Sequence, residues 1–368
     1  MPSDSLANCD AYPTARPMVT FLSPRKLKRL LFSKHRRPAG FTLLELLVAM
    51  IIGSLIVIAL LTLVVQLTET NQKDAARSQV QQDMQAATDF VAQELREAVF
   101  VYNGECLQGN GTPANAADLA TKCPGIINHI PTAMVSSTRT PVLAFWRTKK
   151  LPTAISDLCG ANAAQLSDSA TAATNALVVA GVPCLAGNSY SLVVYAIDTA
   201  NPGNTWSGNA RLIRYELSQF TANATTQANQ NIGYANPLQD PTYKFQQWPY
   251  AKTLINRQTG RPIANPNNPA VLVDFLDDKT ATDINCDEFG GPAKALTPSA
   301  VTSPRGFYAC VRGGGVGTAA IPGENQDVLL VMKGNVSGQS GFDKKFDNNE
   351  RISPLQTRVL IRGVVDKP

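Results

Sequence analysis

The chain has 368 residues, of which 44% are hydrophobic, so it is long and apolar enough to bury one large core or two ordinary ones. This excludes a wholly disordered protein. Charged residues make up only 17%, below the roughly 25% of an average soluble domain. The only histidines, His35 and His129, leave little material for histidine-based metal sites or catalytic triads. The composition therefore argues against most classes of enzyme.

The formal net charge of +5 is distributed unevenly along the chain. Residues 1–40 contain eight Lys or Arg side chains against Asp4 and Asp10, a local charge of +6, so the remaining residues sum to −1. Nucleic-acid binding depends on clustered Lys and Arg. Because the near-neutral remainder has no broad cluster of this kind, no nucleic-acid partner is expected.

Residues 46–65, directly after the basic segment, form twenty consecutive positions without a charge. As a helix they match a hydrocarbon core of ~30 Å at ~1.5 Å per residue. A secretory signal peptide is the alternative, but its apolar region is usually only ~7–15 residues long and ends at a small-residue cleavage site. The excess of Lys and Arg before the span predicts a single-pass inner-membrane protein with a cytoplasmic N-terminus and an exported, periplasmic C-terminal part.

Glu45 lies at the start of this apolar run, where an unpaired carboxylate would cost a few kcal/mol. No Lys or Arg follows it within two helical turns, so its partner must come from another chain or from a newly made terminus. Cleavage before Phe41 would create an α-amino group of the required charge.

The segment from Arg36 through Gly40, followed by Phe-Thr-Leu-Leu-Glu and an uninterrupted apolar span, resembles the N-terminus of type IV prepilins and type II secretion pseudopilins. The resemblance implies cleavage after Gly40 by a prepilin peptidase, N-methylation of Phe41 and a role for Glu45 in assembly. It covers about 30 residues, and the proline frequent in the family's apolar helix is absent.

The resemblance makes residues 1–40 a prepilin leader. That leader is long for the family, and Met18 would start a more usual one, so residues 1–17 are expected to reflect a misassigned start. Residues 41–68 are then the transmembrane and assembly helix, residues 69–100 an amphipathic half-helix, and residues 101–368 an exported head.

The amphipathic half-helix is predicted from an apolar stripe with spacings of three and four residues, formed by Val80, Met84, Ala87, Val91, Leu95 and Ala98. Since no proline interrupts it, one helix is expected from about Phe41 to Phe100. Short β-rich runs follow at residues 141–146, 189–197, 211–217, 270–275, 306–311, 327–332 and 358–365. These indicate an α+β fold in which the long helix packs on a largely antiparallel, pilin-like sheet. Residues 157–181 and 221–269 read as long surface loops.

Six cysteines remain after the leader, an even number in a compartment that permits disulfides. They allow fifteen connectivities, of which pairing between sequence neighbours is the simplest. Zinc is the alternative, but no Cys-x-x-Cys pair exists and His129 is the only exported histidine. The expected disulfide residues are Cys106, Cys123, Cys159, Cys184, Cys286 and Cys310.

Asp283, Asn285 and Asp287 imitate the first half of a calcium loop. The imitation then fails, because Glu288 replaces the turn glycine and Lys294 replaces the bidentate glutamate, so a solvated acidic loop is the favoured interpretation. The glycines at 313–315 and 317 are read as a hairpin turn rather than a phosphate loop. No catalytic residue and no cofactor are predicted.

Within the family, the helix end at residues 94–98, Tyr102 with Cys106, and residues 327–331 resemble PilW-type minor pilins. This implies a low-abundance subunit that primes or caps a type IV pilus. Its expected partners are the prepilin peptidase, other minor and major pilins, the inner-membrane assembly platform and the membrane. The alternatives are a J-like type II secretion pseudopilin and a membrane-anchored exported binding protein or adhesin.

Overall fold

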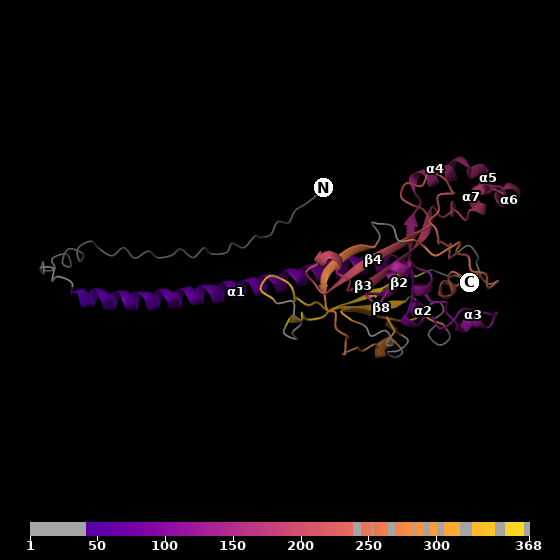
Figure 1. Cartoon of the computed structure of the whole chain (residues 1–368). Coiled ribbons are helices and arrows are strands. Elements are labelled where there is room, and N and C mark those ends of the chain that lie inside the picture. Colours follow the sequence, from indigo (N-terminus) through magenta and orange to yellow (C-terminus); the bar gives the residue numbers. More distant parts are fainter. Residues whose placement is uncertain are drawn as a thin grey trace, which may run out of the picture. The chain divides into compact units, whose positions relative to one another are not determined.

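The computed structural model describes residues 42–237, 244–251, 253–263, 269–282, 284–289, 295–299, 305–316, 326–342 and 350–363. The chain divides into two compact units, Met1–Val64 and Val65–Pro368. The first unit contains the N-terminal part of the long helix α1 (Leu43–Arg96), and the second contains its C-terminal part and two β-sheets (Figure 1).

Helix α1 is continuous because no proline lies within it and most of its residues are good helix formers. Its apolar stripe is buried from Ala76 to Leu95, as the spacing predicted. The helix ends at Arg96, four residues before the expected end at Phe100. The reason is strand β1 (Ala98–Val101), whose aromatic and β-branched side chains pair with strand β2 instead of extending the helix.

The first sheet has five antiparallel strands in sequence order, β1 to β5. The long central strands are β2 (Arg139–Lys150), β3 (Asn188–Asp198) and β4 (Ala210–Ser218), and β5 (Ala270–Leu276) forms one edge. The second sheet has four antiparallel strands: β6 (Leu296–Thr297), β7 (Phe307–Val311), β8 (Asp327–Met332) and β9 (Leu355–Leu360).

The predicted α+β class with antiparallel pairing is therefore confirmed, and the expectation of a single sheet is wrong. All seven predicted strands have counterparts, whereas β1 and β6 were not predicted. Strand β1 had been counted as helix, and β6 is only two residues long, too short for a period-two pattern to appear.

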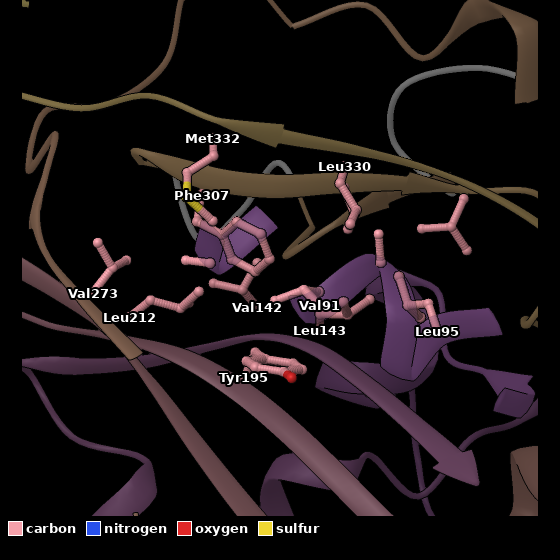
Figure 2. Close-up of a cluster of buried hydrophobic side chains, with 14 of the residues drawn as sticks. Val91, Leu95, Val142, Leu143, Tyr195, Leu212, Val273, Phe307, Leu330 and Met332 are labelled. Carbon is pink, nitrogen blue, oxygen red and sulfur yellow. The ribbon is translucent and has the colours of Figure 1, made fainter. Parts of the chain in front are cut away.

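The main core is enclosed by α1, one face of the first sheet and one face of the second. Figure 2 shows side chains from these three sources directed toward one another. Alternate residues along β8 follow the period of a strand: Val328, Leu330 and Met332 enter this core, while Val331 enters a separate cluster behind the second sheet. Both sheets thus bury two faces.

The other face of the first sheet packs under a cluster of aromatic residues. Trp146 on β2 lies edge-on to Trp248, with ring centroids 5.3 Å apart, and its indole N–H donates to the Tyr102 hydroxyl over 2.8 Å. Tyr102 in turn donates to the backbone carbonyl of Phe245 over 2.6 Å. The segment around residue 248, expected as a surface loop, therefore contributes buried side chains to the head.

Short helices occupy several connections between the strands. Residues 157–181, expected as a loop, are largely helical, because alanine-rich stretches alternate with polar residues that start helices. The side chain of Asp168 accepts a bond from the backbone of Ala170, and that of Asn175 accepts one from Leu177. The helices are α2 (Gly104–Gln108), α3 (Asp118–Thr121), α4 (Thr153–Ala161), α5 (Ala163–Ser167), α6 (Ser169–Ala172) and α7 (Ala176–Val179), with 3-10 turns at Ile126–Asn128, Thr132–Met134, Pro202–Asn204, Phe245–Gln247 and Asp287–Phe289.

Candidate functional site: the assembly helix and its docking to the head

The first turn of α1 contains the predicted assembly residue Glu45. The Glu45 backbone N–H donates to the Thr42 side-chain oxygen at 3.3 Å and to the Thr42 carbonyl at 3.0 Å, so Thr42 caps the helix. Glu45 stands three residues after this cap, the spacing of a capping box, and an acidic side chain in a first turn is favoured by the helix dipole. Gly40 and Phe41, the predicted processing residues, lie outside the described residues.

This capping arrangement was not predicted, although Thr-x-x-Glu is visible in the sequence. The cap bonds the backbone of residue 45, while the Glu45 side chain is favoured by the helix dipole even in a helix that never meets a partner. The presence of the carboxylate therefore does not by itself distinguish an assembly helix from a simple anchor, and the distinction requires a substitution, such as glutamine, that removes the charge and keeps a capping-box residue at this position.

The following turns of α1 present an unbroken apolar surface. The large apolar side chains from Leu43 to Leu67 are all exposed, and α1 is the one described helix whose length and composition would allow it to cross a membrane. The hydroxyls of Ser54 and Thr62 donate to carbonyls of the preceding turn, at 2.8 Å in each case. Because these polar groups are satisfied within the helix, they are compatible with a hydrocarbon environment.

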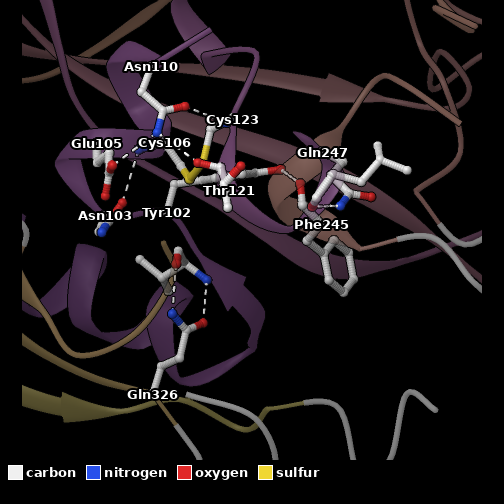
Figure 3. The surroundings of a disulfide bond; sticks show 12 residues. Tyr102, Asn103, Glu105, Cys106, Asn110, Thr121, Cys123, Phe245, Gln247 and Gln326 are labelled. Atoms are coloured by element: carbon white, nitrogen blue, oxygen red, sulfur yellow. Dashed lines mark hydrogen bonds between the residues drawn. A yellow bond between two sulfur atoms is a disulfide. The ribbon is translucent and has the colours of Figure 1, made fainter. Parts of the chain in front are cut away.

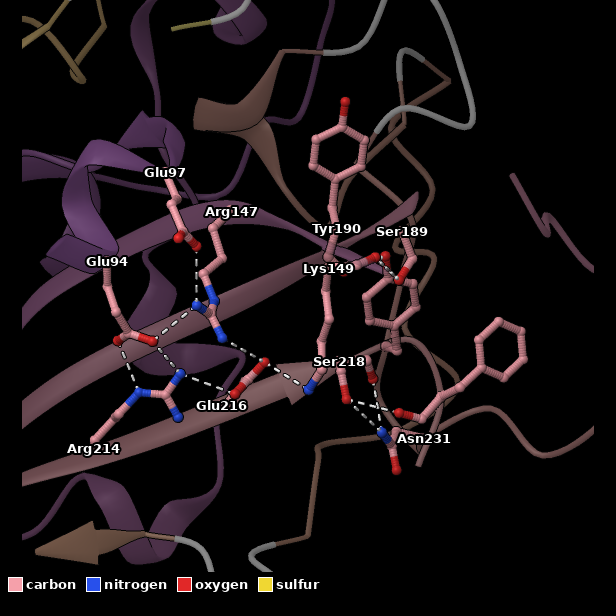
Figure 4. Close-up of polar contacts among 12 residues, drawn as sticks. Glu94, Glu97, Arg147, Lys149, Ser189, Tyr190, Arg214, Glu216, Ser218 and Asn231 are labelled. Atoms are coloured by element: carbon pink, nitrogen blue, oxygen red, sulfur yellow. Dashed lines mark hydrogen bonds and ion pairs between the residues drawn. The ribbon is translucent and has the colours of Figure 1, made fainter. Parts of the chain in front are cut away.

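The C-terminal end of α1 is fixed to the first sheet by a network of charged side chains (Figure 4). Glu94 is buried and accepts two bonds from the Arg214 guanidinium, at 2.8 and 2.7 Å, as well as a bond from the Tyr195 hydroxyl. Arg147 approaches Glu94 at 3.0 Å. Four interactions on one buried carboxylate thus connect α1 to three neighbouring strands.

Glu216 forms the second acidic centre of this network. It receives Lys149 at 2.8 Å, Arg214 at 2.9 Å and Arg147 at 3.6 Å. Burial alone would raise the pKa of Glu216, but these three cations outweigh it and lower that pKa to about 2. Glu216 is therefore charged at neutral pH and balances the guanidinium groups around Glu94.

The structure joins the six cysteines that follow α1 as sequence neighbours: Cys106 with Cys123, Cys159 with Cys184, and Cys286 with Cys310. Their Cα atoms are 5.1, 5.3 and 5.5 Å apart, within the usual range for a disulfide. Figure 3 shows the first pair between two segments that Asn110 also connects, since its side chain bonds Glu105, Thr121 and Cys123.

The weak calcium candidate is not assembled into a site by the described residues. Asp283 lies outside them, and Asn285 and Asp287 are exposed. The Asn285 side chain accepts the Asp287 backbone N–H at 2.9 Å, which is a local turn. Within the part of the chain that the structure describes, no three His, Cys, Asp or Glu side chains are placed to hold a metal ion.

The glycine-rich segment at residues 313–315 and 317 begins the connection from β7 to β8. Gly313 and Gly314 have φ values of +76° and +75°, which favour glycine, and a Cβ atom at Gly314 would overlap the backbone carbonyl of Val101. The Gly314 carbonyl also accepts the Asn103 backbone N–H at 3.3 Å. Gly314 therefore serves close backbone packing against β1, and Gly317 lies outside the described residues.

Comparison with known proteins gives one match. A family described as the prokaryotic N-terminal methylation motif matches residues 35–61, which include the basic flank, Gly40, Phe41, Glu45 and the start of the apolar helix. No curated protein and no solved structure matches the chain. The motif is typical of structural pilins rather than enzymes. The match supports a type IV pilin-like or pseudopilin protein.

Proposed function

We propose that the protein is a PilW-type minor pilin of a type IV pilus, which helps to prime or cap filament assembly. The observation that carries the proposal is the methylation motif at residues 35–61, which runs directly into an exposed apolar helix with Glu45 in its first turn. Prepilin peptidase cleaves after Gly40, and the new Phe41 amine is methylated. The head is periplasmic until the subunit leaves the inner membrane for the pilus.

Glu45 acts in assembly through its charge. A lone helix tolerates this carboxylate near the membrane boundary, where it reaches the headgroups. Inside a filament no water reaches it, so it requires a cation, and an amine keeps its positive charge after one methylation. Pairing between the Phe41 amine of one subunit and Glu45 of a neighbour sets their axial register, as buried polar pairs do in other helical assemblies.

The test of processing is mass spectrometry of the protein purified from membranes of its native host. The expected mature chain begins at N-methylated Phe41, and the precursor accumulates in a strain that lacks prepilin peptidase or that carries Gly40→Leu. An uncleaved N-terminus in a strain with active peptidase would contradict the proposal.

The test of the pilus role is a deletion strain measured for both surface piliation and type II secretion. We expect fewer pili and normal secretion, with recovery on complementation. Lost secretion with normal piliation would instead assign the protein to the pseudopilins. Normal piliation and normal secretion would indicate an anchored binding protein.

A further inference from the structure

A groove of about 580 Å³ lies between the exposed side of α1 and the edge strand β5. It belongs entirely to the second compact unit. Its floor is continuous with the main core, to which Ala87 and Val273 belong, and it is remote in sequence from the processing site. Its lining comes from Asp83, Ala86, Ala87 and Phe90 on α1 and from Val271, Leu272, Val273 and Asp274 on β5.

The mixed lining of the groove includes two exposed large apolar side chains. Phe90 is 44% exposed and Val271 is 38% exposed. Between Ala76 and Arg96, a stretch that the structure describes completely, every other large apolar side chain is buried, so Phe90 is the exception. Ala86 is exposed and carries only a methyl group, which allows another chain to approach the helix backbone closely. Exposed apolar and aromatic side chains that line a concave surface are suited to contact with another chain.

The shape of β5 indicates what kind of segment covers it. Strand β5 is the last strand of its sheet, but its register with β4 shifts on both sides of Leu212, which leaves Leu272 without a partner. Farther along, Leu276 bridges to Gly334. An irregular, partly covered edge is a poor template for an added strand. The groove is therefore better suited to side chains from a helix than to strand addition.

The charges on the groove are of one sign. Asp83 is exposed and has no ion pair among the described residues, and Asp274 accepts the Gly208 backbone N–H at 3.0 Å. No Lys or Arg contributes to the lining. A segment that presented acidic residues would be repelled, whereas one with Lys or Arg beside its apolar residues would be complementary.

We propose that this groove docks a helical segment of a different pilin-like subunit, one that presents apolar side chains with Lys or Arg three or four residues away. The inference rests on the proposed function, because it requires neighbouring subunits, and it adds the surface and chemistry by which one of them is recognised. The apolar side chains contact Phe90 and Val271, and the cation lies beside Asp83.

The test is photo-crosslinking in cells that contain the complete assembly system. Phe90 is replaced by p-benzoyl-phenylalanine, which keeps an aromatic ring at the position. Gln93, which is exposed on α1 but does not line the groove, carries the same group as a matched control. We expect a crosslink from position 90 at least about fivefold stronger than from 93, to a subunit with its own N-terminal methylation motif and at a helical peptide that contains Lys or Arg.

A charge reversal then tests the electrostatic part. Asp83→Lys should reduce the crosslink by about fivefold or more, and replacing the partner's Lys or Arg with Asp should restore it. A crosslink to a second copy of this chain, to an acidic peptide or to an unrelated protein would overturn the proposal. So would the absence of a crosslink in pili that contain the variant. If the wild-type protein is itself absent from pili, the proposed function has failed, and this inference fails with it.

Discussion

Replacing Glu94 with alanine tests whether the charged network holds α1 on the head. Glu94 is 5% exposed and accepts bonds from Arg214, Arg147 and Tyr195. Removing one member of a buried ion pair costs about 3–5 kcal/mol, because the remaining charges stay buried without their partner. Arg147 and Arg214 keep their ion pairs with Glu216 in this variant. We therefore expect the free energy of unfolding to fall by an amount at the lower end of this range, about 3 kcal/mol.

The matched control is Glu97→Ala. Glu97 belongs to the same network, but its side chain is 55% exposed and contacts only Arg147, at 3.4 Å. Glu97→Ala should lower the free energy of unfolding by less than about 1 kcal/mol. Thermal unfolding of the detergent-solubilised chain, followed by circular dichroism, should show a melting temperature about 6–10 °C lower for Glu94→Ala and nearly unchanged for Glu97→Ala. An equal decrease in melting temperature in the two variants would refute the conclusion that the network around Glu94 holds α1 on the first sheet.

Three further predictions concern pH, the helix cap and the disulfides. Because the pKa of Glu216 is lowered to about 2, its stabilising charge is complete above its unfolded pKa of about 4.3 and is lost as the pH falls toward 2; unfolding measured across that range should show this loss, and Glu216→Gln should flatten it. Glu45→Ala and Glu45→Gln should both insert and be processed, but both should lower subunit content in sheared pili by about tenfold; normal incorporation of the glutamine variant, which keeps the capping box, would show that the charge is dispensable. Peptide mapping without reduction should recover three linked pairs, and joint replacement of Cys159 and Cys184 by serine should cost about 3 kcal/mol locally; alkylation of all six thiols without prior reduction would contradict both the pairing and export.

The helix followed from periodicity and most strands from short β-rich runs, since an apolar stripe at three and four residues and a β-rich run are both local properties of the sequence. Which strands share a sheet is not local, and the second sheet was therefore missed. The end of α1 was misplaced because Ala98 continues the apolar stripe although it already belongs to β1. At Ala98 the strand pairing with β2 is more favourable than continuation of the helix.

The charged network was also missed, because Glu, Arg and Lys are usually solvated. One signal was present: Glu94 stands three residues after Val91, on the buried side of the helix, where a carboxylate needs a partner. Its partners Arg147 and Arg214 lie 53 and 120 residues later, and nothing local connects them to it. The Thr42 cap, in contrast, could have been read from the sequence.

The helices α4 to α7 form a module inserted between β2 and β3, which packs against the segment that follows β4. The module leaves the first sheet after Lys150 and returns at Asn188, and these two residues face each other across β2 and β3. Its buried cluster is centred on Ile155 and Leu177 and also contains Phe220 and Ala224 from the segment after β4, and its disulfide lies entirely within the module. Because its ends are already adjacent, related chains can lengthen, shorten or exchange this module while the sheet beneath keeps its register, so sequence divergence among relatives should concentrate there.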